Sequence, residues 1–138
     1  MNENVNLIQK LEQGRAEFAY NCVKDALNKL DSRRQKEYKS YVKKIPQMIL
    51  SNGLGSTLAF VLSKSENGNA YDLIYSQIEM YLRSQSASRI RLPDQIGLIQ
   101  WIVSCNSTEY KYASREILSF FNWLRRFAEG LIEGEADE

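Results

Sequence analysis

The chain has 138 residues, a hydrophobic content of 43% and a formal net charge of +1, values that fit one globular domain with a sizeable core. No apolar run reaches the ~18–20 residues that a membrane span needs, so we expect no membrane contact. Histidine is absent, which removes the usual general base near neutral pH and the commonest metal ligand, and we expect neither an enzyme nor a metal or other cofactor.

Apolar residues recur at helical spacing along the whole chain, and only two prolines interrupt it. This pattern predicts an all-α fold: a single-domain bundle of about six helices, covering residues 1–138, with a long C-terminal helix. The expected helices span residues 5–30, 32–51, 55–64, 70–84, 94–105 and 107–133.

Arg15 is the unusual residue of the first expected helix. It projects onto the same face as a row of apolar residues, namely Ile8, Leu11, Phe18, Cys22 and Ala26. A buried arginine without a partner is costly, so we expect a carboxylate from another helix. Glu116, which flanks the apolar stripe of the last helix, is the first candidate and Glu79 the second. The alternative is an arginine that reaches solvent from the helix edge.

The second expected helix is strongly basic. Its segment 33–44 holds six basic residues and one acid. Helical phase places Lys36, Lys39 and Lys43 on the outer face with Lys44 beside them, while the inner face carries Tyr38, Tyr41, Ile45 and Ile49. Cations spaced along a helix can follow a nucleic-acid backbone, although a merely solvated face is the simpler reading. Pro46 should kink this helix or divide it in two.

The middle of the chain predicts short helices and one basic loop. We expect a third helix that bears Leu58, Ala59 and Leu62, a fourth that buries Tyr71, Ile74, Ile78 and Tyr81, and a fifth that holds Ile96, Ile99, Trp101 and Ile102. The segment 83–93 is rich in serine and arginine, which is typical of a mobile loop. Its Arg89 and Arg91 are candidates for contacts with a neighbouring subunit.

The last expected helix is two-sided and about twice the usual ~11–12 residues in length. A stripe of Tyr110, Ala113, Ile117, Phe120, Leu124, Phe127 and Leu131 forms one face. Arg115 and Arg126 lie on the opposite face as a second candidate phosphate patch. Trp123, on the flank, is a candidate partner contact, or else a tryptophan half-buried at the core boundary. Asn106 and Glu109 predict a capping box at its start.

Charge is separated between the body and the end of the chain. Residues 1–128 hold all 18 basic and 12 of the 17 acidic residues, a net charge of +6. The other five acids follow Ala128, and four of them lie in the C-terminal tail at about 130–138. The basic body suggests contact with phosphate; the tail could mimic phosphate or aid solubility. Cys22 and Cys105 belong to no metal or redox motif, so we expect reduced thiols and a cytoplasmic protein.

Three segments resemble the small α-helical subunit of Cmr complexes, the type III-B CRISPR effectors that silence foreign RNA. They are QGRAEFAYNCV at 13–23, EYKSYVKKIPQMILSNGLGSTLAF at 37–60 and EYKYASREILSFFNWLRRFAEGLIEGE at 109–135. The resemblance spans nearly the whole chain and is looser between residues 64 and 100.

The resemblance implies a non-catalytic subunit in an antiviral ribonucleoprotein. Several copies would stack beside the guide-bearing backbone subunits and, with the large subunit, line the duplex of guide RNA and target RNA. Two other readings stay open from the residues: a helical adaptor that binds protein alone, and a metal-dependent nuclease that uses scattered carboxylates.

Overall fold

The structure is a computed structural model that describes residues 3–136, with side chains from residue 6 onward. Within this range it contains six α-helices and no strand, which confirms the all-α prediction. The helices are Glu3–Lys29 (α1), Ser32–Asn52 (α2), Leu54–Lys64 (α3), Ala70–Arg83 (α4), Leu98–Ser104 (α5) and Ser107–Leu131 (α6). None of them is long and apolar enough to cross a membrane.

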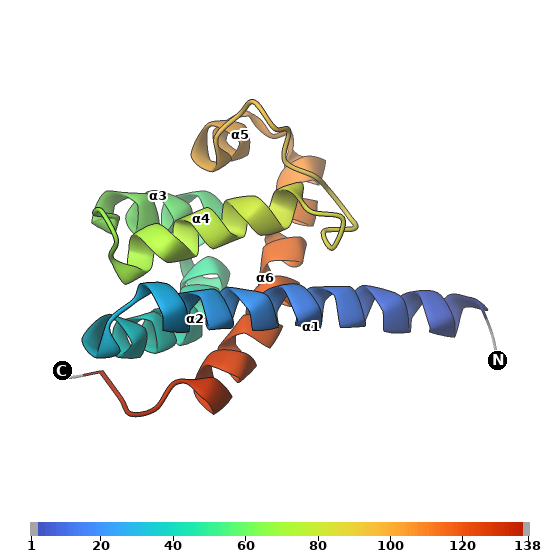
Figure 1. The fold of residues 1–138 in the computed structure, drawn as a ribbon. Coiled ribbons are helices and arrows are strands. Elements are labelled where there is room, and N and C mark those ends of the chain that lie inside the picture. Colours follow the sequence, from blue (N-terminus) through green and yellow to red (C-terminus); the bar gives the residue numbers. More distant parts are fainter. Residues whose placement is uncertain (1–2, 137–138) are drawn as a thin grey trace.

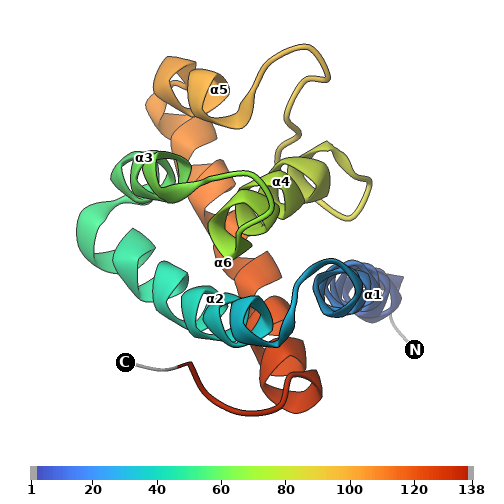
Figure 2. The same cartoon turned by 60° about the vertical axis from the view of Figure 1, so that its left-hand side comes forward.

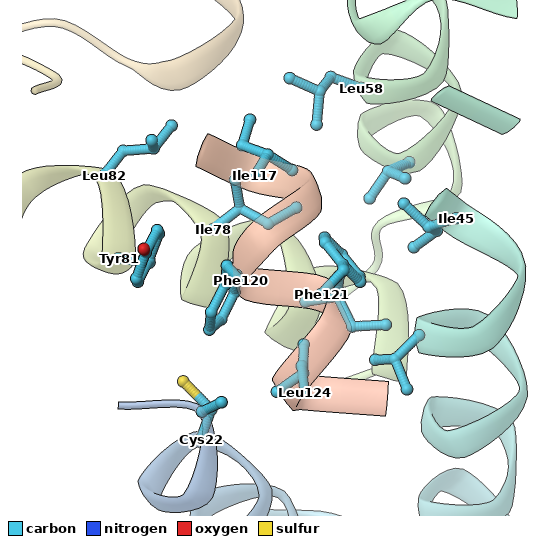
Figure 3. Close-up of a cluster of buried hydrophobic side chains, with 14 of the residues drawn as sticks. Cys22, Ile45, Leu58, Ile78, Tyr81, Leu82, Ile117, Phe120, Phe121 and Leu124 are labelled. Carbon is cyan, nitrogen blue, oxygen red and sulfur yellow. The ribbon is translucent and has the colours of Figure 1, made fainter. Parts of the chain in front are cut away.

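The long helix α6 is the centre of the bundle. It packs against α1, α2 and α4, and it runs between α1 on one side and α2 on the other (Figure 2). The expected stripe supplies Ala113 to the core. It also supplies Ile117, Phe120 and Leu124, which are labelled in Figure 3. Phe121, outside that stripe, is equally buried, because helices cover α6 on more than one side.

Side-chain caps set the ends of several helices. Asp31 accepts a hydrogen bond from Arg34 N at 2.9 Å and starts α2, and the predicted capping box of Asn106 and Glu109 is present at the start of α6. Gly53 separates α2 from α3 with a φ of 87°, a conformation that a side chain would strain. These local signals explain why most boundaries lie within two residues of those expected from the sequence.

Pro46 was expected to kink the second helix or divide it in two, and the division does not occur. α2 runs without a break through Pro46 to Asn52. Proline removes one backbone hydrogen bond, but Val42, Ile45 and Ile49 around it are buried, and their packing holds the turn in place. Tertiary packing therefore outweighs the local penalty.

The structure decides which residues of α3 face the core, and it corrects the expected start of α5. α3 turns Leu54, Thr57, Leu58 and Val61 inward, whereas Ala59 and Leu62 are exposed. α5 begins at Leu98 and not at residue 94. Its first backbone groups are satisfied by α4, because Leu98 N donates to Glu79 Oε2 at 2.9 Å and Ile99 N to Tyr75 Oη at 3.0 Å.

The first helix extends past the rest of the bundle (Figure 1). Its inner half contributes Ala19, Cys22 and Val23 to the core. Ile8 and Leu11 were expected on the same buried face but are exposed, and Leu7 beside them is 59% exposed. The helical stripe continues, but no other helix of the described chain covers its N-terminal end.

Candidate nucleic-acid interface

The four lysines of α2 that the sequence proposed as phosphate contacts have different surroundings. Lys43 and Lys44 are exposed. Lys36 is half-buried, and its side chain lies against Gly134 of the C-terminal segment. Lys39 is buried. The structure therefore does not present these four lysines as one continuous solvent-facing row.

Lys39 is a correction to the sequence-based assignment. Its Nζ donates to Ile132 O at 3.2 Å and Gly134 O at 2.9 Å, and it pairs with Glu135 Oε1 at 3.2 Å. The end of α6 leaves carbonyl groups without helical partners, and a cation there satisfies them and the negative end of the helix dipole. Lys39 thus binds the chain's own C-terminal segment and is not available to phosphate.

One feature of the sequence could have indicated the contact between Lys39 and the C-terminal segment: the body of the chain is basic and its tail is acidic. The segment after α6 runs back beneath α2 (Figure 2), with Ile132 buried and Glu135 on Lys39. Asp137 and Glu138, the last acids of the expected tail, lie outside the described residues.

Lys43 is joined by two arginines of α6. Lys43, Arg125 and Arg126 are all exposed and line one hollow of about 410 Å³, together with Glu129 and Gly130. No ion pair links these three cations to a carboxylate that the structure describes. Arg125 was not among the predicted phosphate contacts. It lies on the flank of α6, and it joins the group of cations because α2 packs beside that flank and brings Lys43 to the same hollow.

Arg115 extends the same outer face of α6. It is exposed and lies eleven residues before Arg126, a rise of about 16 Å along the helix. Eleven residues complete three turns, so the two guanidinium groups share a face. α6 thus carries cations both at the hollow and one stretch further toward α5.

Trp123 is half-buried, which removes the reason for proposing it as a partner contact. Its Nε1 donates to Glu12 Oε2 at 2.9 Å, and its ring stacks on Phe127 with centres 6.0 Å apart. The indole therefore joins α6 to α1 within the chain. This is the core-boundary alternative that the sequence left open.

The basic loop is anchored more firmly than expected. Leu92 is fully buried and its N donates to Leu82 O at 3.0 Å, while Ala87 is 5% exposed. Arg89 donates from its backbone to Glu116 Oε2 at 3.3 Å, and its guanidinium lies 3.5 Å from the same oxygen. Arg91 remains exposed and is the freer of the two loop candidates.

Arg15 and Glu116 lie together at the centre of a buried polar cluster. Arg15 Nε is 3.3 Å from Glu116 Oε1, and Glu116 is fully buried. Arg15 also donates to Glu12 Oε1 at 3.0 Å and Ser88 Oγ at 3.2 Å. The second candidate partner, Glu79, instead caps α5. The cluster joins α1, α6 and the loop after α4.

Tyr81 completes this cluster. Its hydroxyl donates to Glu116 Oε1 at 2.5 Å and accepts from Arg15 Nε at 3.3 Å. Burial, followed by the hydrogen bond and charge of Glu116, raises the pKa of Tyr81 above its usual range. Burial alone would lower the pKa of Arg15, but its hydrogen bond to Tyr81 and the charge of Glu116 raise it. These shifts favour a charged Arg15 and a neutral Tyr81.

The described residues contain no group of three or more cysteine, aspartate or glutamate side chains that could hold a metal ion. Burial, with a smaller contribution from Asp25, raises the pKa of the Cys22 thiol to about 12. A protonated thiol is a poor nucleophile and metal ligand. The chemistry available in the described residues is therefore that of charged groups and hydrogen-bond donors at the protein surface.

A comparison with known families decides what kind of protein this is. Residues 11–131 match the model of a CRISPR-associated protein family, Cmr5. The chain belongs to the Cmr5 family of CRISPR-associated proteins. The fold is also similar to the crystal structure of a CRISPR-associated Cmr5 family protein from Thermus thermophilus. The two share 26% sequence identity with a TM-score of 0.69, over 89% of this chain and 97% of the Thermus chain.

The Cmr5 match includes the candidate interface but not the chain ends. Lys43, Arg115, Arg125 and Arg126 all lie inside residues 11–131. The exposed apolar residues Leu7 and Ile8 lie outside the match. So does the segment from Ile132 that binds Lys39.

Proposed function

We propose that this Cmr5 family member is a non-catalytic small subunit of a type III-B CRISPR Cmr ribonucleoprotein complex in the cytoplasm. Several copies stack beside the guide-bearing backbone subunits and the large subunit. Their basic surfaces line the duplex of guide RNA and target RNA during antiviral RNA silencing. Membership of the Cmr5 family supports the assignment to the complex.

The observation that carries the RNA contact is the convergence of Lys43, Arg125 and Arg126. Two helices bring three exposed cations to one hollow, with Glu129 as the single carboxylate among its lining residues. Arg115 lies on the same face of α6. Cations arranged in this way bind phosphates along a backbone without reading bases, and base pairing with the guide supplies sequence recognition.

The test is a titration of fluorescent duplex RNA across a range of salt concentrations. Lys43→Glu combined with Arg126→Glu should weaken binding severalfold. It should also flatten the dependence of log affinity on log salt by roughly 0.7–0.9 per lost phosphate contact. The control is Lys10→Glu combined with Lys24→Glu, which changes net charge equally at two exposed positions of α1. Equal effects of the two pairs would show a nonspecific charge effect and contradict the proposed interface.

A helical adaptor that binds protein alone is the second candidate function. The exposed apolar residues Leu7, Ile8 and Leu11 at the projecting end of α1 favour a protein contact there. The same titration separates the two functions, because an adaptor would show no salt-dependent binding of RNA. Stacked copies would use both surfaces, the cations for RNA and the apolar end of α1 for a neighbour.

A further inference from the structure

The helices α2, α3 and α4 pack against one another (Figure 2). Three aromatic side chains, one from each of these helices, meet between them. Tyr41 of α2 stacks on Tyr71 of α4, with ring centres 3.9 Å apart and an angle of 13° between the rings. Phe60 of α3 meets Tyr71 edge to face at 5.9 Å. All three residues are half-buried. Their inner edges therefore close the core while part of each stays in contact with solvent.

Phe60 has two lysines beside its ring. Lys44 Nζ lies 6.0 Å and Lys64 Nζ 5.8 Å from the ring centre. Both lysines are exposed, and neither forms an ion pair with a carboxylate that the structure describes. The two ammonium groups, which come from different helices, thus lie near the same ring. Both can attract an anion bound beside that ring.

Glu37, the carboxylate that contacts Tyr41, is already engaged. Glu37 accepts from the Tyr41 hydroxyl at 3.0 Å and lies 4.0 Å from Arg33. Burial, followed by the hydrogen bond and charge of Glu37, raises the pKa of Tyr41 to about 12. The Tyr41 hydroxyl therefore already has its hydrogen-bond partner within the chain, whereas the two lysines lie beside Phe60.

An aromatic face with cations beside it is the arrangement that binds unpaired nucleotides. The base stacks on the ring, and the phosphates on either side meet the cations. A stacked base contributes more than an exposed contact between a lysine and a ring, so the base can displace the lysines toward the phosphates. A paired base inside a duplex already has neighbours on both faces and cannot stack in this way. The arrangement therefore fits an unpaired or extruded nucleotide.

We propose that Phe60, Lys44 and Lys64 form a platform that binds one unpaired nucleotide of RNA. Phe60 stacks on the base, Lys44 and Lys64 bind the adjoining phosphates, and Tyr71 supports the Phe60 ring. The identity of the ligand as RNA rests on the proposed function. The platform differs from the Lys43–Arg125–Arg126 hollow because it binds the base as well as the backbone.

The experiment compares single-stranded RNA with duplex RNA of the same sequence. Phe60→Leu should weaken binding of the single strand at least about fivefold and leave duplex binding unchanged. It removes no charge, so the salt dependence should stay as in the parent protein. Lys44→Gln combined with Lys64→Gln, both at exposed positions, should flatten the single-strand salt dependence by roughly 0.7 per lost contact. Phe60→Trp, which keeps an aromatic face, should restore binding.

A strand carrying 2-aminopurine reports stacking directly. Its fluorescence should be quenched by the parent protein and by Phe60→Trp but not by Phe60→Leu. The platform is overturned if Phe60→Leu binds and quenches like the parent protein, or if the two lysine changes leave the salt dependence intact. If the platform is overturned in this way while duplex binding still depends on Lys43 and Arg126, the proposed function stands. If the parent protein binds neither single-stranded nor duplex RNA, both proposals are overturned.

Discussion

Arg15 shows how one buried charge can be tolerated at the centre of a helical bundle. Arg15 is 5% exposed, and its guanidinium contacts Glu116, Tyr81, Glu12 and Ser88. Glu116, with no exposed surface, receives donors from Arg15, Tyr81 and Arg89. A buried ion pair adds little net stability by itself, but removal of one partner leaves an uncompensated charge.

Arg15→Ala should therefore be strongly destabilising. We expect a loss of about 3 kcal/mol in the free energy of unfolding, the lower end of the usual range, because Tyr81 and Arg89 still donate to Glu116. Urea unfolding followed by circular dichroism measures this change. The matched control is Lys24→Ala on the exposed side of α1, which should change stability by less than about 0.5 kcal/mol. Equal midpoints for the two variants would mean that the buried pair contributes nothing.

At the scale of elements, α1 differs from the other helices because its stripe is longer than the core that covers it. Leu7, Ile8 and Leu11 are 59%, 60% and 38% exposed at the end that projects from the bundle (Figure 1). A row of exposed apolar residues marks a contact with another molecule more often than isolated ones do. In the proposed complex, the natural occupant is a further copy of the chain.

Ile8→Gln combined with Leu11→Gln should reduce association between copies without unfolding the protein. Both side chains are exposed, so the unfolding midpoint should stay near that of the parent. Sedimentation velocity should show a monomer or weak oligomer for the parent and a monomer for the variant. Leu50→Gln combined with Val103→Gln removes two other exposed apolar side chains and serves as the control. Association that falls equally in both variants would argue against a specific contact through α1.

For the whole molecule, buried thiol and phenol groups predict a loss of stability at alkaline pH. Burial, with a smaller contribution from Asp25, raises the pKa of Cys22 from 9.0 to about 12, and burial raises that of Tyr38. Above pH 9 the unfolded chain loses the Cys22 proton, whereas the folded protein keeps it. The unfolded state then binds fewer protons, so stability is complete below pH 9 and falls as pH rises toward 12.

Urea unfolding at several pH values between about 8 and 11 tests this linkage. Cys22 should contribute a slope of up to about 1.4 kcal/mol per pH unit, and Cys22→Ala should remove that part. Val23→Ala truncates a neighbouring buried side chain without removing a titrating group. It should lower stability at every pH and keep the slope. A Cys22→Ala variant with the parent's slope would contradict the assignment.

Much of the helical architecture was determined by the sequence itself. Periodicity placed Ile117, Phe120 and Leu124 in the core, and the Asn106–Glu109 capping box marked the start of α6. Such signals depend on the geometry of a single helix and its immediate neighbours in the chain, so they can be read before any tertiary contact is known. The sequence also predicted a partner for Arg15, because burying an unpaired guanidinium on an apolar face costs too much free energy.

The tertiary structure decided which cations are free. Helical phase alone places Lys39 and Lys43 on neighbouring outer positions of α2. The C-terminal segment returns to bury Lys39, whereas α6 places Arg125 and Arg126 beside Lys43. Tertiary packing also brings Trp123 to Glu12 and leaves the end of α1 uncovered. It places lysines from two helices beside Phe60. Helical phase gives the direction of a side chain from its own axis, and only the packing of distant segments determines what lies in that direction.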